Sequence, residues 1–130
     1  MKVHLFAPPD YWKLTPEQLN NIIGKGGCGP GGFGDYLVPD KIWGLEIKPA
    51  CQIHDYMYAM GYTVEEKQEA DRVFMNNMLR LVGAAGGNWL ILALRRSAAA
   101  KYYRAVADFG GPSFWRNKNT SEQMQMVEVS

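Results

Sequence analysis

This chain of 130 residues has only two cysteines, a net charge close to zero and no long apolar run. Its two cysteines allow at most one disulfide bond, and a formal net charge of +1 argues neither for nor against an anionic partner. The longest apolar stretch, residues 89–94, is far shorter than the ~20 residues that a membrane-spanning helix needs. The first ten residues contain two prolines and lack the apolar run of a signal peptide. We therefore expect a soluble protein without a transmembrane segment or a classical secretion signal.

Strand-like alternation and internal repeats are also missing, whereas helix start and stop signals are frequent. A hydrophobic content of 47% suffices for one core, so we expect a single domain at residues 1–116 and a disordered polar tail at 117–130. Thr15 and Thr63 each begin a capping-box pattern, and Asn88 can cap a third helix. The fold class is therefore predicted as mostly α, with residues 35–45 forming a structured loop. The predicted helices are Pro16–Ile23, Pro49–Met60, Val64–Val82 and Trp89–Ala107.

One helical segment carries basic side chains close together: Arg95, Arg96, Lys101 and Arg104. Such a cluster can meet the phosphates of a lipid or a nucleic acid, but a solvated helix face is the commoner explanation. We therefore predict no nucleic-acid partner.

The segment from Cys51 to Tyr58 concentrates chemically reactive side chains on one side of a predicted helix. A helix turns about 100° per residue, so Cys51, His54, Asp55 and Tyr58 share a face. An imidazole, a carboxylate, a thiol and a phenol are costly to bury unless they have partners or a function. This face is therefore the first candidate for a functional site.

A second carboxylate, Asp71, lies in the next predicted helix. The connection Gly61-Tyr62-Thr63 is tight, so the two helices should pack antiparallel and bring Asp71 back toward His54. We predict that the carboxylate lies about 2.6 to 3.2 Å from a ring nitrogen of His54, which is hydrogen-bond distance.

A glycine-rich run precedes this helix and includes the sequence Cys28-Gly29-Pro30-Gly31-Gly32. The order of this run, the Cys-x-x-His-Asp-x-x-Tyr helix and a further aspartate resembles the calcium loop and catalytic helix of the phospholipase A2 superfamily. The resemblance covers residues 24–78. The close spacing of His54 and Asp71 is similar to that of the compact viral, bacterial and fungal members, because it leaves no room for the β-hairpin of the animal enzymes.

The resemblance implies a role for each matched residue. Backbone carbonyls of Gly27, Gly29 and Gly31 and the carboxylate of Asp55 would bind calcium. His54 would be the general base that activates a water, Asp71 would orient it, and Tyr58 would brace Asp71. The backbone N–H of Gly29, together with calcium, would stabilise the oxyanion.

The same resemblance places a disulfide bond between Cys28 and Cys51. We expect this bond in an oxidising compartment, whereas two buried thiols are expected in a reducing cytosol. Two departures from the family pattern, Gly27 in place of an aromatic residue and Met57 in place of a cysteine, remove no catalytic group but affect loop rigidity and crosslinking.

The resemblance implies calcium-dependent hydrolysis of the sn-2 ester of glycerophospholipids at a phospholipid membrane surface. The alternative is a catalytically silent lipid-binding or structural module, such as one in a phage or virus particle. A zinc site at Cys28, Cys51, His54 and Asp55 is disfavoured because no Cys-x-x-Cys pair supports it. Secretion by a non-classical route, association with a virion or phage, and a cytoplasmic location are all compatible with the sequence.

Overall fold

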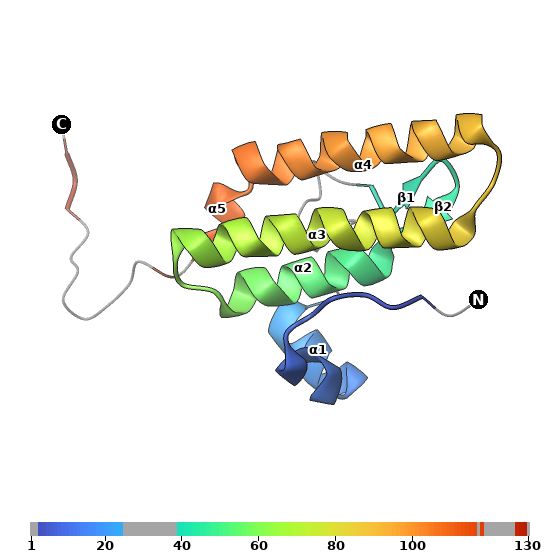
Figure 1. Cartoon of the computed structure of the whole chain (residues 1–130). Coiled ribbons are helices and arrows are strands. Elements are labelled where there is room, and N and C mark those ends of the chain that lie inside the picture. Colours follow the sequence, from blue (N-terminus) through green and yellow to red (C-terminus); the bar gives the residue numbers. More distant parts are fainter. Residues whose placement is uncertain (1–2, 25–38, 117, 119–126, 130) are drawn as a thin grey trace.

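The structure, a computed structural model, describes residues 3–24, 39–116, 118 and 127–129. Within these residues the fold is mostly helical, as predicted, with two very short strands in addition (Figure 1). The elements in chain order are the 3-10 helix η1 (Pro9–Lys13), α1 (Pro16–Ile23), β1 (Lys41–Ile42), β2 (Leu45–Glu46), α2 (Lys48–Met60), α3 (Val64–Ala85), α4 (Trp89–Phe109) and α5 (Gly111–Phe114).

Three of the four predicted helix starts are confirmed by their caps, and α2 begins at Lys48, one residue before the predicted start, without a side-chain cap. Thr15 and Thr63 both form complete capping boxes, with Gln18 and Glu66 as their respective partners. Asn88 accepts a hydrogen bond from the backbone N–H of Ile91 and so caps α4. α3 and α4 extend a little beyond the predicted ends: α3 reaches Ala85, before Gly86 takes a positive φ of 66°, and α4 reaches Phe109.

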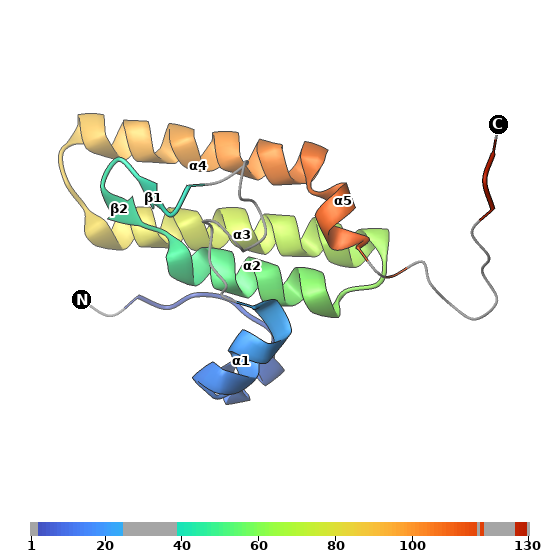
Figure 2. The same ribbon diagram turned by 180° about the vertical axis from the view of Figure 1, so that it is seen from behind.

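Helices α2, α3 and α4 form the body of the molecule, with α3 in the middle (Figures 1 and 2). α2 and α3 are antiparallel, as the short connection between them predicts. The hydrophobic core lies among these helices and the short strands, and its buried members are Ile42, Ile47, Ala50, Cys51, Phe74, Met78, Val82, Ala99 and Val106. Side chains that α2 and α3 direct toward each other are therefore enclosed.

The N-terminal segment lies on the side of α2 opposite to α4 (Figure 1). Its attachment to α3 uses Asn77, whose side-chain oxygen accepts from the N–H of Phe6 at 2.7 Å and whose amide donates to the Phe6 carbonyl at 2.8 Å. The guanidinium of Arg80 covers the Phe6 ring at 4.4 Å. α1 buries none of its residues, although its apolar residues follow helical spacing. Contacts of residues 3–8 with α3 and of α1 with α2 together anchor this segment.

The prediction of a structured loop at residues 35–45 missed a short hairpin in its last part, and residues 35–38 lie outside the described residues. β1 and β2 pair antiparallel, with Lys41 opposite Glu46 and Ile42 opposite Leu45. The connecting residues Trp43 and Gly44 have φ values of 48° and 78°, the pattern of a type I′ turn. Tryptophan rarely adopts such a φ, so no sequence signal pointed to this hairpin.

The predictions of no transmembrane segment and of a polar C-terminal tail can be compared with the described residues only. None of the described helices is long and apolar enough to cross a membrane. The tail predicted at 117–130 falls mostly outside the described residues, and of those described in it, Val127 and Val129 are exposed.

Candidate active site

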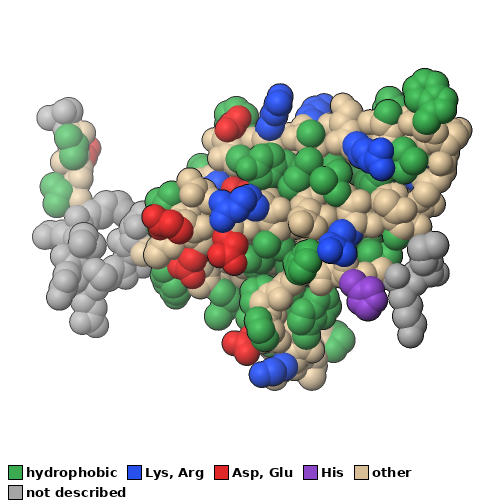
Figure 3. All heavy atoms as spheres, viewed as in Figure 1, with side chains coloured by type: hydrophobic (Ala, Val, Ile, Leu, Met, Phe, Trp, Pro, Cys, Tyr) green, Lys and Arg blue, Asp and Glu red, His purple; other side chains and the backbone are tan. Residues whose placement is uncertain are grey.

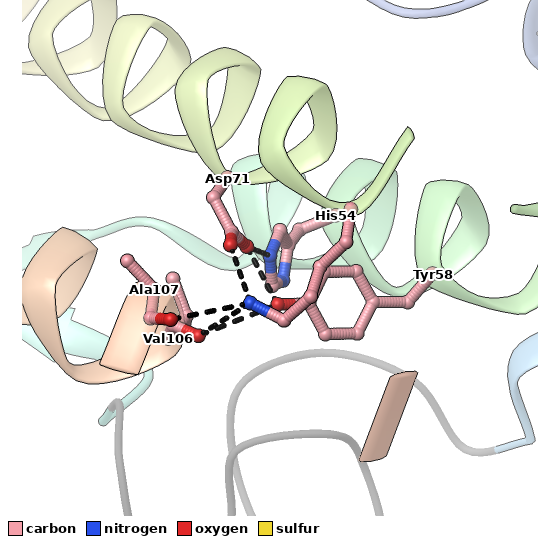
Figure 4. Close-up of polar contacts among 6 residues, drawn as sticks. His54, Tyr58, Asp71, Val106 and Ala107 are labelled. Atoms are coloured by element: carbon pink, nitrogen blue, oxygen red, sulfur yellow. Dashed lines mark hydrogen bonds and ion pairs between the residues drawn. The ribbon is translucent and has the colours of Figure 1, made fainter. Parts of the chain in front are cut away.

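His54, Tyr58 and Asp71 meet between α2 and α3 (Figure 4). His54 Nε2 lies 2.8 Å from Asp71 Oδ1, and the Tyr58 hydroxyl donates to the same oxygen at 2.6 Å. The predicted distance between the imidazole and Asp71 is therefore confirmed. The cause is the one expected: α2 presents His54 and Tyr58 one turn apart, and the antiparallel α3 places Asp71 opposite them.

The imidazole of His54 is enclosed on several sides. It is 1% exposed, stacks on the Phe74 ring at a centroid distance of 4.6 Å, and lies 4.1 Å from the centre of the Tyr58 ring. Burial lowers the pKa of His54, and the hydrogen bond to Asp71 opposes this shift without cancelling it. The ring is therefore neutral at pH 7.

The partner of Nε2 determines which nitrogen of this neutral ring carries the proton. An ionised carboxylate can only accept hydrogen bonds, so Nε2 must donate to Asp71. The lone pair of the neutral imidazole then lies on Nδ1. A general base requires such a lone pair, and Asp71 fixes its location.

Asp71 is held in the charged form that this arrangement requires. Burial alone would raise the pKa of its carboxyl group, but hydrogen bonds from His54, Lys67 and Tyr58 outweigh burial and lower it. Burial, followed by the hydrogen bond to Asp71, raises the pKa of Tyr58, so the phenol keeps its proton and remains a donor. In this site the charged carboxylate of Asp71 therefore accepts hydrogen bonds from two neutral donors, His54 and Tyr58, on its Oδ1 atom.

Lys67 is a fourth member of the cluster, and the sequence analysis missed it. Its Nζ donates to Asp71 Oδ2 at 2.8 Å and to the backbone carbonyls of Val106 at 3.1 Å and Ala107 at 3.4 Å. The spacing of four residues between Lys67 and Asp71 was a usable signal, because such residues are neighbours on a helix. The α4 carbonyls, about 40 positions further along the chain, had no signal in the sequence.

Asp55 follows His54 on α2 and is 6% exposed. A carboxylate combined with backbone carbonyls is a set of hard oxygen ligands, which suits calcium better than zinc or copper. The other predicted ligands, Gly27, Gly29 and Gly31, lie outside the described residues, as does the predicted oxyanion donor. Among the described residues there is no cluster of three or more His, Cys, Asp or Glu side chains that could hold a metal ion. Calcium binding therefore stays a prediction that the chemistry of Asp55 fits.

The predicted disulfide bond can be followed at one end. Cys51 is 4% exposed and belongs to the hydrophobic core, on the helix that carries His54. Cys28 lies outside the described residues, so the pairing stays a prediction.

Comparisons of this chain with protein families, with curated proteins and with solved structures found no match. The resemblance to phospholipase A2 therefore stays a prediction from the sequence motifs, and the functional argument depends on the geometry around His54.

Proposed function

We propose that this chain is a hydrolase in which His54 activates a water molecule for attack on a carboxylic ester. The single observation that carries the proposal is the buried 2.8 Å contact between His54 Nε2 and Asp71 Oδ1, braced on the same oxygen by Tyr58. A histidine oriented by a buried carboxylate is a recurring arrangement for general-base catalysis. The glycine-rich motif and Asp55 specify the reaction further as calcium-dependent cleavage of the sn-2 ester of glycerophospholipids.

The proton transfers follow from the tautomer of His54. Nδ1 takes a proton from water as the water oxygen bonds to the ester carbonyl carbon, and Asp71 stabilises the imidazolium that forms. When the bond to the leaving alcohol breaks, the imidazolium returns the proton to the alkoxide. The products are a fatty acid and a lysophospholipid, and His54 is neutral again.

Calcium would be held by Asp55 with the carbonyls of Gly27, Gly29 and Gly31, and when bound it would polarise the ester carbonyl. The carboxylate of Asp55 contributes negative charge to that site, while His54 contributes none. The two adjacent residues therefore have separable roles, one in metal binding and one in proton transfer.

One observation favours the second candidate, a silent lipid-binding or structural module. The side chains of His54, Tyr58 and Asp71 are all buried, and together with Lys67 they join α2, α3 and the end of α4. A polar network of this kind also stabilises a core without any turnover.

The deciding experiment measures fatty acid release by the full chain from phosphatidylglycerol vesicles, with calcium and with excess chelator. We expect release that the chelator abolishes. His54→Gln should lower it by about 100-fold or more, since that is the usual cost of losing a general base. The matched control is His4→Gln, because His4 is exposed and is the other histidine of the chain.

Calcium affinity, measured by calorimetry, separates the two roles. His54→Gln should bind calcium as the wild type does, whereas Asp55→Asn should bind it more weakly and the exposed control Asp40→Asn should not differ. Calcium binding by the wild type without fatty acid release would favour the silent module. Release by folded His54→Gln within tenfold of the wild type would exclude His54 as the base.

A further inference from the structure

Lys67 occupies an unusual place for a partly buried cation. It lies in the first turns of α3, where the positive end of the helix dipole disfavours a positive charge. Its ammonium group has three N–H bonds, and the structure gives them three acceptors: Asp71 Oδ2 and the carbonyls of Val106 and Ala107. The two carbonyls belong to the last turn of α4, where the negative end of a helix dipole favours a cation. The partners of Lys67, and not its own helix, therefore stabilise its charge.

The three hydrogen bonds to Asp71 divide between its two oxygens. Both donors from α2, His54 and Tyr58, reach Oδ1, whereas Lys67 is the donor to Oδ2 among the residues that the structure describes. Rotation about the bond to a carboxylate is soft, so two donors on one oxygen do not by themselves fix the plane of the group. A third donor on the other oxygen does. Lys67 thereby determines how Oδ1 faces the imidazole.

Lys67 is more exposed to solvent than Asp71. Its side chain is 12% exposed, compared with 3% for that of Asp71. A surface hollow of about 560 Å³ opens beside the pair, and Arg72, Tyr103 and Asp108 also line it. Acidic and basic side chains intermix over the start of α3 (Figure 3). Water in this hollow would compete for Oδ2 if the ammonium were removed.

We propose that Lys67 is a positioning residue that locks the carboxylate of Asp71 against His54 by tying its second oxygen to the end of α4. Lys67 does not touch the substrate and acts through Asp71. The kinetic consequence rests on the proposed function, but the geometric consequence does not. The His54 Nε2–H···Oδ1 bond should depend on Lys67 whether or not the chain turns over a substrate.

The test compares Lys67→Met, which keeps the length but removes the charge and the donors, with Lys67→Arg, which keeps both. The control is Lys101→Met, because Lys101 is an exposed lysine of α4. The first readout is the proton resonance of His54 Nε2–H at fixed pH in the full chain. We expect it to broaden or move upfield in Lys67→Met, and to stay near the wild-type position in Lys67→Arg and Lys101→Met.

The second readout is the rate of fatty acid release. Lys67→Met should lower kcat by about tenfold or more with little change in KM, because a misplaced catalytic group affects the chemical step. Lys67→Arg should recover most of this loss. Should Lys67→Met lack a folded circular dichroism spectrum, Lys67→Gln replaces it; its uncharged side chain is one atom shorter but keeps an NH₂ donor, so we expect a change in the resonance in the same direction and of smaller size.

The outcomes distinguish this inference from the proposed function. A wild type without turnover refutes the hydrolase, and the resonance still tests Lys67. A folded Lys67→Met protein with an unchanged resonance and an unchanged kcat overturns the positioning role, even if its melting temperature falls, because a purely structural tie between α3 and α4 would affect stability alone.

Discussion

Replacing Asp71 with asparagine tests the polar cluster most directly, because Asp71 is the acceptor on which the donors of His54, Tyr58 and Lys67 converge. Asparagine has nearly the same size but offers one oxygen and one NH₂ group in place of two acceptor oxygens. If its oxygen faces His54 and Tyr58, the NH₂ group faces the ammonium of Lys67. If the amide is flipped, the NH₂ group faces two other donors. Neither orientation satisfies every partner.

The expected loss of stability follows from these contacts. The better orientation loses one hydrogen bond between charged groups, worth about 1.5 to 3 kcal/mol, and weakens the two that remain. Breaking a buried ion pair by removing one partner costs about 3 to 5 kcal/mol. Lys67 keeps its two α4 carbonyls as acceptors and its side chain is 12% exposed, so its charge stays partly compensated and the cost lies between these two figures. We expect the free energy of unfolding to fall by about 2 to 4 kcal/mol at pH 7.

The loss should also depend on pH in a defined direction. The pKa of Asp71 is lower in the folded protein than in the unfolded chain, because its hydrogen bonds outweigh burial. Its charge therefore contributes stability above the unfolded pKa of about 3.9, and this contribution disappears as the pH falls through the folded pKa. The difference between the wild type and Asp71→Asn should be largest near neutral pH and should shrink in strong acid.

The assay is urea unfolding followed by circular dichroism, at pH 7 and at several acidic pH values. Asp108→Asn is the control, because Asp108 is an exposed aspartate of α4 beside the same hollow. A difference below about 1 kcal/mol at pH 7 would show that the three hydrogen bonds contribute no more than surface ones do. A difference that does not change with pH would show that the charge of Asp71 is not their source.

Two packing predictions concern the elements that position the site. Asn77→Ala removes both hydrogen bonds to the Phe6 backbone. It should lower the unfolding free energy by about 1 to 3 kcal/mol and speed proteolysis of the N-terminal segment. The control Asn76→Ala, at an exposed neighbouring residue, should have neither effect. Gly61→Ala would place a Cβ 2.9 Å from Phe114 and should destabilise by about 1 to 3 kcal/mol in thermal melting, although its φ of −81° suits alanine. Gly83→Ala, in the last turn of α3 where an added Cβ meets no atom within 4 Å, should instead stabilise by up to about 1 kcal/mol, and equal effects of the two glycine variants would contradict this explanation.

The parts of the structure that the sequence predicted depend on local rules. Thr15 and Thr63 announce helix starts because a capping box is formed by residues three positions apart. The contact between His54 and Asp71 spans 17 positions, yet it also follows from local features: two helical faces and one tight connection.

The parts that the sequence did not predict depend on distant segments or on strained backbone. Lys67 donates hydrogen bonds to carbonyls of α4, and no sequence pattern in either segment predicts this contact. The turn at Trp43 requires a positive φ that a tryptophan adopts only under tertiary constraint; its carbonyl accepts from Arg95 at 2.8 Å, a contact 52 positions away. The exposure of α1 likewise depends on where the N-terminal segment docks. The helical spacing of the apolar residues in α1 predicts a helix but not how far that helix is buried.

The register of α2 against α3 explains why the four side chains of the cluster lie at two distances from the turn that joins these helices. His54 lies seven residues before Gly61, and Asp71 lies eight residues after Thr63, so both are about 10 to 12 Å from the turn along their helices. Tyr58 and Lys67 lie three and four residues from the same points and form a second level nearer the turn. The length of the connection between α2 and α3 sets which residues of the two helices lie opposite each other. The site therefore depends on this length as much as on the side chains themselves. The end of α4 then closes the second level through Lys67, which lies outside the pair of His54 and Asp71 and yet contacts the carboxylate within it.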